Sequence, residues 1–124
     1  RMIDHMSVGV ADIPRSKVFY DAVFAALGGQ CHDAGETYLG YGETGAVFWT
    51  LKAEHPVVPD SQSGLHICFK AKSREMVDRF YRAALSSGGK DNGAPGLRSN
   101  YGPSYYAAFV VDPDGYRLEA YCGT

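Results

Sequence analysis

The sequence predicts an α+β domain in which one β-α-β-β-β module occurs twice. Two strand-like segments, "HMSVGV" and "HICFKA", each begin with a histidine and alternate between an apolar face and a mixed face. A helical pattern that ends at paired glycines follows each of them. The two histidines, His5 and His66, are separated by 66 − 5 = 61 positions, and the same shift superimposes the two helical patterns.

The first module is predicted from alternation and helix signals. In its first strand Met6, Val8 and Val10 share one face, and His5, Ser7 and Gly9 share the other. Asp12 is a favourable N-cap, and the helix after it ends at Gly28-Gly29. Three strand-like segments follow near 30–34, 37–42 and 46–51.

The second module repeats this order after a linker over 52–63 that contains two prolines. Ser73 is the predicted N-cap, and Gly88-Gly89 ends the helix. A Gly/Pro-rich segment over 90–104 predicts a long, functional loop. Strands near 105–111 and 116–122 follow, joined by the turn "DPDG". We therefore expect modules at about 2–52 and 64–123 within a single domain over 1–124.

Two turns that end with glycine give a second correspondence between the two modules. Trp49 lies four residues beyond Gly45 of "GETG", and Glu119 lies four residues beyond Gly115 of "DPDG". If the modules are related by a pseudo-twofold axis, Trp49 and Glu119 occupy equivalent positions, as do His5 and His66. Four inward positions are thus predicted, and three of them carry metal-ligand side chains.

His5, His66 and Glu119 form a candidate metal site. Two imidazoles and one carboxylate on strands can bind one face of Mn²⁺, Fe²⁺, Co²⁺, Ni²⁺ or Zn²⁺ and leave other positions open. The ordinary alternative is that the histidines are hydrogen-bonded or exposed, and that Glu119 pairs with Arg117 or Lys70. The shared register of the two histidines favours the metal.

Other side chains are candidates for the wall of a substrate cleft. Ser7 and Cys68 share the histidine faces, and Trp49 is either a wall of the cleft or ordinary core packing. Tyrosine hydroxyls and a loop arginine, which is otherwise solvated, could contact a substrate. The predicted substrate-binding residues are Ser7, Trp49, Cys68, Arg98, Tyr101 and Tyr105.

Composition excludes several classes of protein. The formal charge is −2 and no basic stripe is present, so nucleic acid is not an expected partner. No apolar run approaches the length that spans a membrane, and no signal-peptide profile opens the chain, so we expect a cytoplasmic protein with no membrane partner. The three cysteines predict free thiols.

Two long segments resemble a known family. "MIDHMSVGVADIPRSKVFYDAVFAALG" is similar to the opening, and "DPDGYRLEAY" to the closing signature, of the glyoxalase/bleomycin-resistance/dioxygenase superfamily, also called vicinal oxygen chelate proteins. The resemblance implies paired βαβββ modules that curl around a cleft. It also implies an enzyme whose divalent metal, held by His5, His66 and Glu119, chelates neighbouring oxygens of a small substrate.

The resemblance also bears on the reaction and the assembly. Trp49 stands where glyoxalase I-type lyases carry a fourth ligand, which leaves a set similar to extradiol dioxygenases and fosfomycin-modifying thiol transferases. In the isomerases of this family a ligand carboxylate also acts as the base, which makes Glu119 the candidate catalytic residue. The alternative is a metal-free binding protein like the bleomycin-sequestering members. Relatives of this length pair as homodimers, some by exchanging modules between chains.

Overall fold

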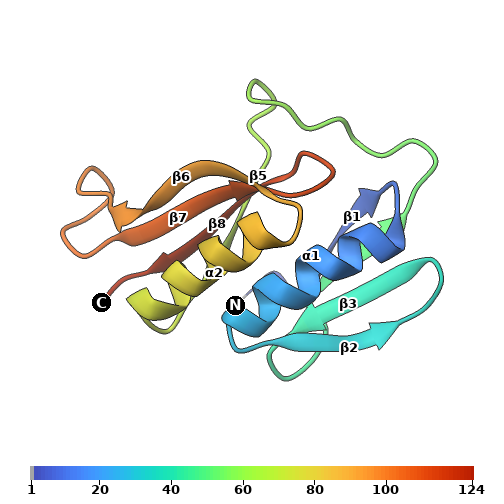
Figure 1. Cartoon of the computed structure of the whole chain (residues 1–124), viewed down its shortest axis with the longest axis horizontal. Coiled ribbons are helices and arrows are strands. Elements are labelled where there is room, and N and C mark those ends of the chain that lie inside the picture. Colours follow the sequence, from blue (N-terminus) through green and yellow to red (C-terminus); the bar gives the residue numbers. More distant parts are fainter. Residues whose placement is uncertain (1) are drawn as a thin grey trace.

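The computed structural model describes residues 2–124 and has the predicted β-α-β-β-β order twice (Figure 1). The first module contains β1 (Met6–Val10), α1 (Ile13–Ala26), β2 (Gln30–Ala34), β3 (Tyr38–Gly42) and β4 (Phe48–Lys52). The second contains β5 (His66–Lys70), α2 (Arg74–Ser86), β6 (Lys90–Leu97), β7 (Tyr106–Val111) and β8 (Arg117–Cys122). The predicted fold class is therefore confirmed.

Each module forms its own mixed four-stranded sheet. The strand orders are β1-β4-β3-β2 and β5-β8-β7-β6, so β1 and β5 are edge strands. The parallel pairs have the same register in both modules. Ser7 lies opposite Trp49, and Cys68 lies opposite Glu119. Trp49 and Glu119 thus occupy equivalent places, as the register of the turns predicts.

Both helices begin at the predicted caps. Asp12 accepts a hydrogen bond from the backbone N–H of Arg15 at 2.9 Å, and Ser73 accepts one from Met76 at 3.2 Å. These side chains satisfy backbone donors that a helix start leaves without partners. The helices lie next to each other, and each crosses one face of its own sheet (Figure 1). Within residues 2–124, neither helix is long and apolar enough to cross a membrane.

Aromatic rings dominate the buried core beneath the helices. In the first module Phe24 packs against Phe48, with ring centroids 5.9 Å apart. Phe69 of β5 reaches across from the second module and packs edge-on against both rings, at 5.1 and 5.5 Å. Because buried aromatic pairs add stabilisation beyond their buried area, Phe69 helps to hold the two modules together.

The turn between β7 and β8 also joins the modules. Asp112 orders the turn by accepting hydrogen bonds from the backbone N–H groups of Asp114 and Tyr116, at 2.9 and 2.8 Å. Asp114 accepts a hydrogen bond from the Arg15 guanidinium at 2.8 Å, and the Tyr116 hydroxyl donates to the Gly9 carbonyl at 2.6 Å. The "DPDG" signature is thus a contact between the second module and the start of the first.

One prediction is wrong. The segment over 90–104 is not a loop throughout, because its first half forms β6. This edge strand pairs with β7 through two register shifts, on either side of Gly93, whose φ is +146°. A strand at a sheet edge tolerates Pro95, and irregularities of this kind accommodate the glycines. The Arg98 guanidinium steadies the irregular strand by donating to the carbonyls of Ala94 and Gly96, at 2.8 and 2.9 Å.

Candidate functional site

The face of the second sheet opposite α2 carries a buried carboxylate. Along β8, Leu118 and Ala120 belong to the buried core cluster, and the alternation of a strand places Glu119 on the other face. Only 3% of Glu119 is nevertheless exposed to solvent. A carboxylate this buried needs polar partners, because burial without them is costly.

Both oxygens of Glu119 have such a partner. His66 Nε2 lies 2.8 Å from Oε1, and the Tyr105 hydroxyl donates to Oε2 at 2.7 Å. Burial, followed by the hydrogen bond to Glu119, raises the pKa of Tyr105 well above its ordinary value. Partial burial of the thiol, followed by the adjacent Glu119, raises the pKa of Cys68 to about 12. The hydroxyl and the thiol therefore stay protonated. Tyr105 donates to the carboxylate, and the Cys68 thiol, beside it, donates to the Phe69 carbonyl at 3.9 Å.

A cavity of about 410 Å³ opens beside this carboxylate. Aromatic rings form much of its wall. The ring of Phe109 stacks on His66 at 6.1 Å, and Tyr105 stacks on Tyr121 at 4.1 Å. The lining residues are His66, Asn92, Tyr101, Tyr105, Phe109, Arg117 and Glu119. This combination of aromatic walls with a few polar groups is typical of sites for small molecules.

The equivalent face of the first sheet is simpler. Trp49 lies across Gly40, so closely that a Cβ on Gly40 would meet the indole ring at 2.6 Å. The ring of Tyr38 lies 6.3 Å from that of Trp49, and Ser7 is exposed beside them. This face presents an aromatic surface where the second sheet presents Glu119.

His5 is separate from His66 and Glu119. More than half of its side chain, 57%, is exposed, and Nδ1 lies 2.8 Å from the Asp4 carboxylate. Among the residues that the structure describes, no group of three or more His, Cys, Asp and Glu side chains is placed to hold a metal ion. One chain thus brings together two of the three predicted ligands.

The other predicted site residues divide between the two sheets. Tyr101 and Tyr105 line the cavity, Cys68 lies beside Glu119, and Ser7 and Trp49 lie on the first sheet. Arg98 is not among the residues that line the cavity. Its guanidinium, which binds backbone carbonyls of β6, also lies over the Phe109 ring at 5.3 Å. The partners of the Arg98 guanidinium are therefore groups of the protein itself.

Three lining residues were not predicted. Phe109 is opposite Glu119 in the antiparallel register of β7 and β8, and Arg117 shares the face of Glu119 two residues earlier. The side-chain alternation of β7 and β8 could therefore have placed Phe109 and Arg117 on the same face as Glu119. Asn92 belongs to the irregular strand that was predicted as a loop, and no pattern placed it at the site.

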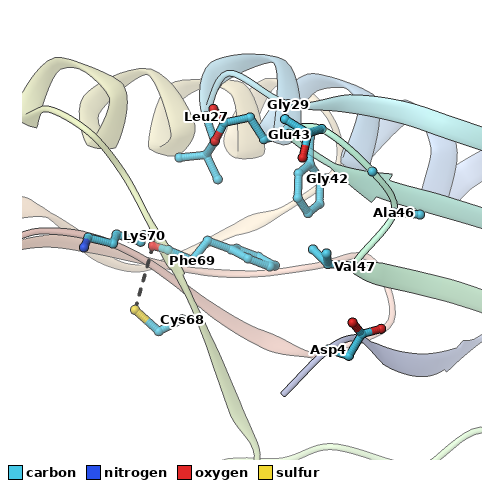
Figure 2. A pocket seen from close by; sticks show the side chains of 13 residues that line it. Asp4, Leu27, Gly29, Gly42, Glu43, Ala46, Val47, Cys68, Phe69 and Lys70 are labelled. Carbon is cyan, nitrogen blue, oxygen red and sulfur yellow. Dashed lines mark hydrogen bonds between the residues drawn. The ribbon is translucent and has the colours of Figure 1, made fainter. Parts of the chain in front are cut away.

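A second hollow of about 680 Å³ lies between the modules (Figure 2). Its apolar part includes Leu27, Val47 and Phe69, with the ring of Phe69 directed toward Val47. Asp4 and Glu43 lie on opposite sides of it. Cys68 of β5 lines this hollow and also lies beside Glu119, so β5 separates the hollow from the Glu119 cavity.

Two βαβββ modules, with a histidine and a carboxylate on parallel first and last strands, define a glyoxalase-like protein. The profile of the Glyoxalase/Bleomycin resistance protein/Dioxygenase superfamily matches residues 2–120. The chain belongs to this superfamily.

Solved structures agree with this assignment. A glyoxalase/bleomycin resistance protein from Albidiferax ferrireducens has a TM-score of 0.85 and 29% sequence identity, and the match covers 98% of both chains. A glyoxalase-related enzyme from Fulvimarina pelagi has a TM-score of 0.76 at 16% identity, covering 98% of this chain and 88% of that one. The fosfomycin resistance protein FosX from Listeria monocytogenes has 0.71 at 16% identity, covering 97% and 91%. The last two show the fold alone. No curated protein matches the sequence.

Proposed function

We propose that this protein is a metal-dependent enzyme that binds neighbouring oxygens of a small substrate at Glu119. The observation that carries the proposal is the contact at 2.8 Å between His66, which is partly exposed, and the buried Glu119, at the edge of the 410 Å³ cavity. The reaction would be of the lyase or isomerase, dioxygenase or transferase type.

The pair fits a divalent ion. Ligand atoms at about 2.1 Å from one ion and at right angles to each other lie about 3 Å apart, close to the separation of Nε2 and Oε1. Imidazole and carboxylate together suit Mn²⁺, Fe²⁺, Co²⁺, Ni²⁺ or Zn²⁺. Such an ion would also compensate the buried charge of Glu119.

The third ligand in this proposal is His5 of the partner subunit. Two observations support a homodimer with a shared site. His5 does not reach His66 and Glu119 within one chain, although His5 and His66 occupy equivalent positions in the two modules. In addition, β1 and β5 each pair on one side only, and an unpaired strand edge is a template for another chain. Association of two copies through these edges would bring the missing imidazole to the pair.

The protein's own residues then have distinct roles. A bound divalent ion would supply Lewis acidity to two neighbouring substrate oxygens. Glu119 would hold the ion and accept a proton from the substrate carbon or hydroxyl, since a ligand carboxylate retains basic lone pairs. Tyr101 and Phe109 would enclose the substrate, and Arg117 would place a positive charge near it. Trp49, from the first sheet, would close the opposite wall.

Metal analysis of protein purified without chelators tests the proposal. We expect divalent metal in the wild type and in His55→Ala, whose histidine is exposed in the linker, and little metal in His5→Ala and Glu119→Ala. Mixing the two deficient variants adds a sharper test, because a heterodimer with a shared site contains one complete ligand set. Metal binding should partly return in the mixture. The proposal is wrong if the wild type retains no more metal than Glu119→Ala.

A metal-free binding protein is the second candidate. The aromatic lining of the cavity favours it, and so does the fact that both Glu119 oxygens already have protein partners. A ligand panel that quenches Trp49 fluorescence in the presence of chelator would support this candidate. Quenching that depends fully on added metal would count against it.

A further inference from the structure

We infer that Tyr105 is a positioning residue that makes Glu119 a one-oxygen ligand and directs Oε1, beside His66, toward the bound ion. The inference rests on the proposed function and adds a residue whose hydroxyl acts through Glu119. It also changes the role predicted for Tyr105 from the sequence, which was contact with the substrate.

The two oxygens of Glu119 have different environments. Oε1 lies against the imidazole of His66 at 2.8 Å, whereas Oε2 accepts the hydroxyl proton of Tyr105 at 2.7 Å. A hydrogen bond between a hydroxyl and a buried carboxylate is strong, because its acceptor is charged. With Oε2 engaged by Tyr105, Oε1 is the oxygen of Glu119 that would bind an ion together with His66.

The ring of Tyr105 is fixed, so its hydroxyl can set the orientation of the carboxylate. On one side it stacks on Tyr121, with centroids 4.1 Å apart and an angle of 28° between the planes. Tyr101 packs against it at 5.2 Å. The Tyr105 carbonyl accepts a hydrogen bond from the backbone N–H of Arg98 at 2.7 Å, which closes the loop before β7. Ring and backbone are therefore both held.

Two consequences follow for the site. A carboxylate that binds through one oxygen occupies one coordination position, which leaves more positions for substrate oxygens. Partners that hold a ligand in place also raise metal affinity, and removing one typically costs 10- to 100-fold in affinity. The hydroxyl of Tyr105 is therefore expected to matter for metal binding before any substrate is present.

The experiment compares Tyr105→Phe with Tyr101→Phe in metal-depleted dimeric protein. Both variants remove one hydroxyl from the same loop, but Tyr101 is 63% exposed and its hydroxyl does not contact Glu119. Co²⁺ is titrated against a chromophoric chelator, and the visible absorption of the bound Co²⁺ is recorded. We expect Tyr105→Phe to weaken Co²⁺ binding by about tenfold or more and to alter the absorption bands. Tyr101→Phe should match the wild type in both readouts.

The outcomes separate the inference from the proposed function. If Tyr105→Phe binds Co²⁺ as tightly as Tyr101→Phe, with the same spectrum, Tyr105 has no positioning role and the metal site stands without it. If the wild type binds no Co²⁺, the proposed function and this inference both fail. Should circular dichroism show that Tyr105→Phe is unfolded, Tyr121→Leu, which keeps the hydroxyl and removes the stacking ring, provides the same comparison.

Discussion

The buried carboxyl group of Asp112 should make the stability of the protein depend on pH. Asp112 opens the turn between β7 and β8 and is only 3% exposed. Its Oδ1 accepts the backbone N–H groups of Asp114 and Tyr116, and the Tyr20 hydroxyl donates to Oδ2. Burial nevertheless outweighs these hydrogen bonds and raises the pKa of Asp112 from 3.8 to about 6.

The sign of the effect follows from this raised pKa. The folded protein holds the proton more tightly than the unfolded chain does, so the contribution of Asp112 to stability is complete below pH 3.8 and is lost as the pH rises through 6. A shift of about 2 pKa units corresponds to about 3 kcal/mol of unfolding free energy in total. Most of it, about 2 kcal/mol, is lost between pH 4 and pH 7.

Asp112→Asn isolates this contribution, because an amide of nearly the same shape does not titrate. Urea unfolding, followed by Trp49 fluorescence, is measured for both proteins across that pH range. We expect the free energy of unfolding of the wild type, relative to Asp112→Asn, to fall by about 2 kcal/mol from pH 4 to pH 7. Asp33→Asn, on the exposed part of β2, controls for the loss of an aspartate. A difference between wild type and Asp112→Asn that is constant with pH would refute the reasoning.

Two further predictions concern the faces of the sheets. Because the pKa of Cys68 is about 12 rather than the ordinary 9.0, its thiolate fraction at neutral pH is about a thousandfold lower, and iodoacetamide should label it slowly. Glu119→Gln should speed that labelling, with Cys31 in the same digest as the internal reference for mass spectrometry, and an unchanged rate would contradict the stated influence of Glu119. Gly40→Ala should displace Trp49, shift its fluorescence and cost about 1–3 kcal/mol, since the added Cβ would overlap the indole ring. Gly45→Ala, where nothing lies within 4 Å, should have little effect in the same chemical unfolding assay, and equal effects of both substitutions would count against this packing.

Local signals made much of the fold predictable. The caps Asp12 and Ser73 act within three residues of themselves, so their role depends on little else. The equivalence of Trp49 and Glu119 followed from turn spacing, because the side-chain alternation of a strand preserves the face over four residues. The strand β6 escaped prediction because its glycines and Pro95 signal a loop, whereas pairing with β7 keeps the segment extended.

The site was predictable only in part because its contacts are not local. That His66 and Glu119 meet depends on parallel pairing of β5 with β8. The duplicated pattern predicted inward positions for both residues but not this strand pairing. The place of His5 depends on how whole modules associate, and strand periodicity says nothing about that. The partners of Arg98 are backbone carbonyls of an irregular strand, so no residue pattern pointed to them.

The packing of the two modules has a consequence for any site that they share. Within one chain the helices lie against each other and Phe69 fixes β5 to the first module, while β1 and β5 keep free edges. In the proposed function, a ligand set that needs His5 together with His66 would be completed only when two copies associate. Metal binding and dimer formation would be linked by one free energy, so that each strengthens the other by the same factor. Trp49, which stands in place of a fourth metal ligand, is consistent with this arrangement. The first module would contribute an imidazole and an aromatic wall, and the second would contribute the carboxylate and its hydrogen-bond partners.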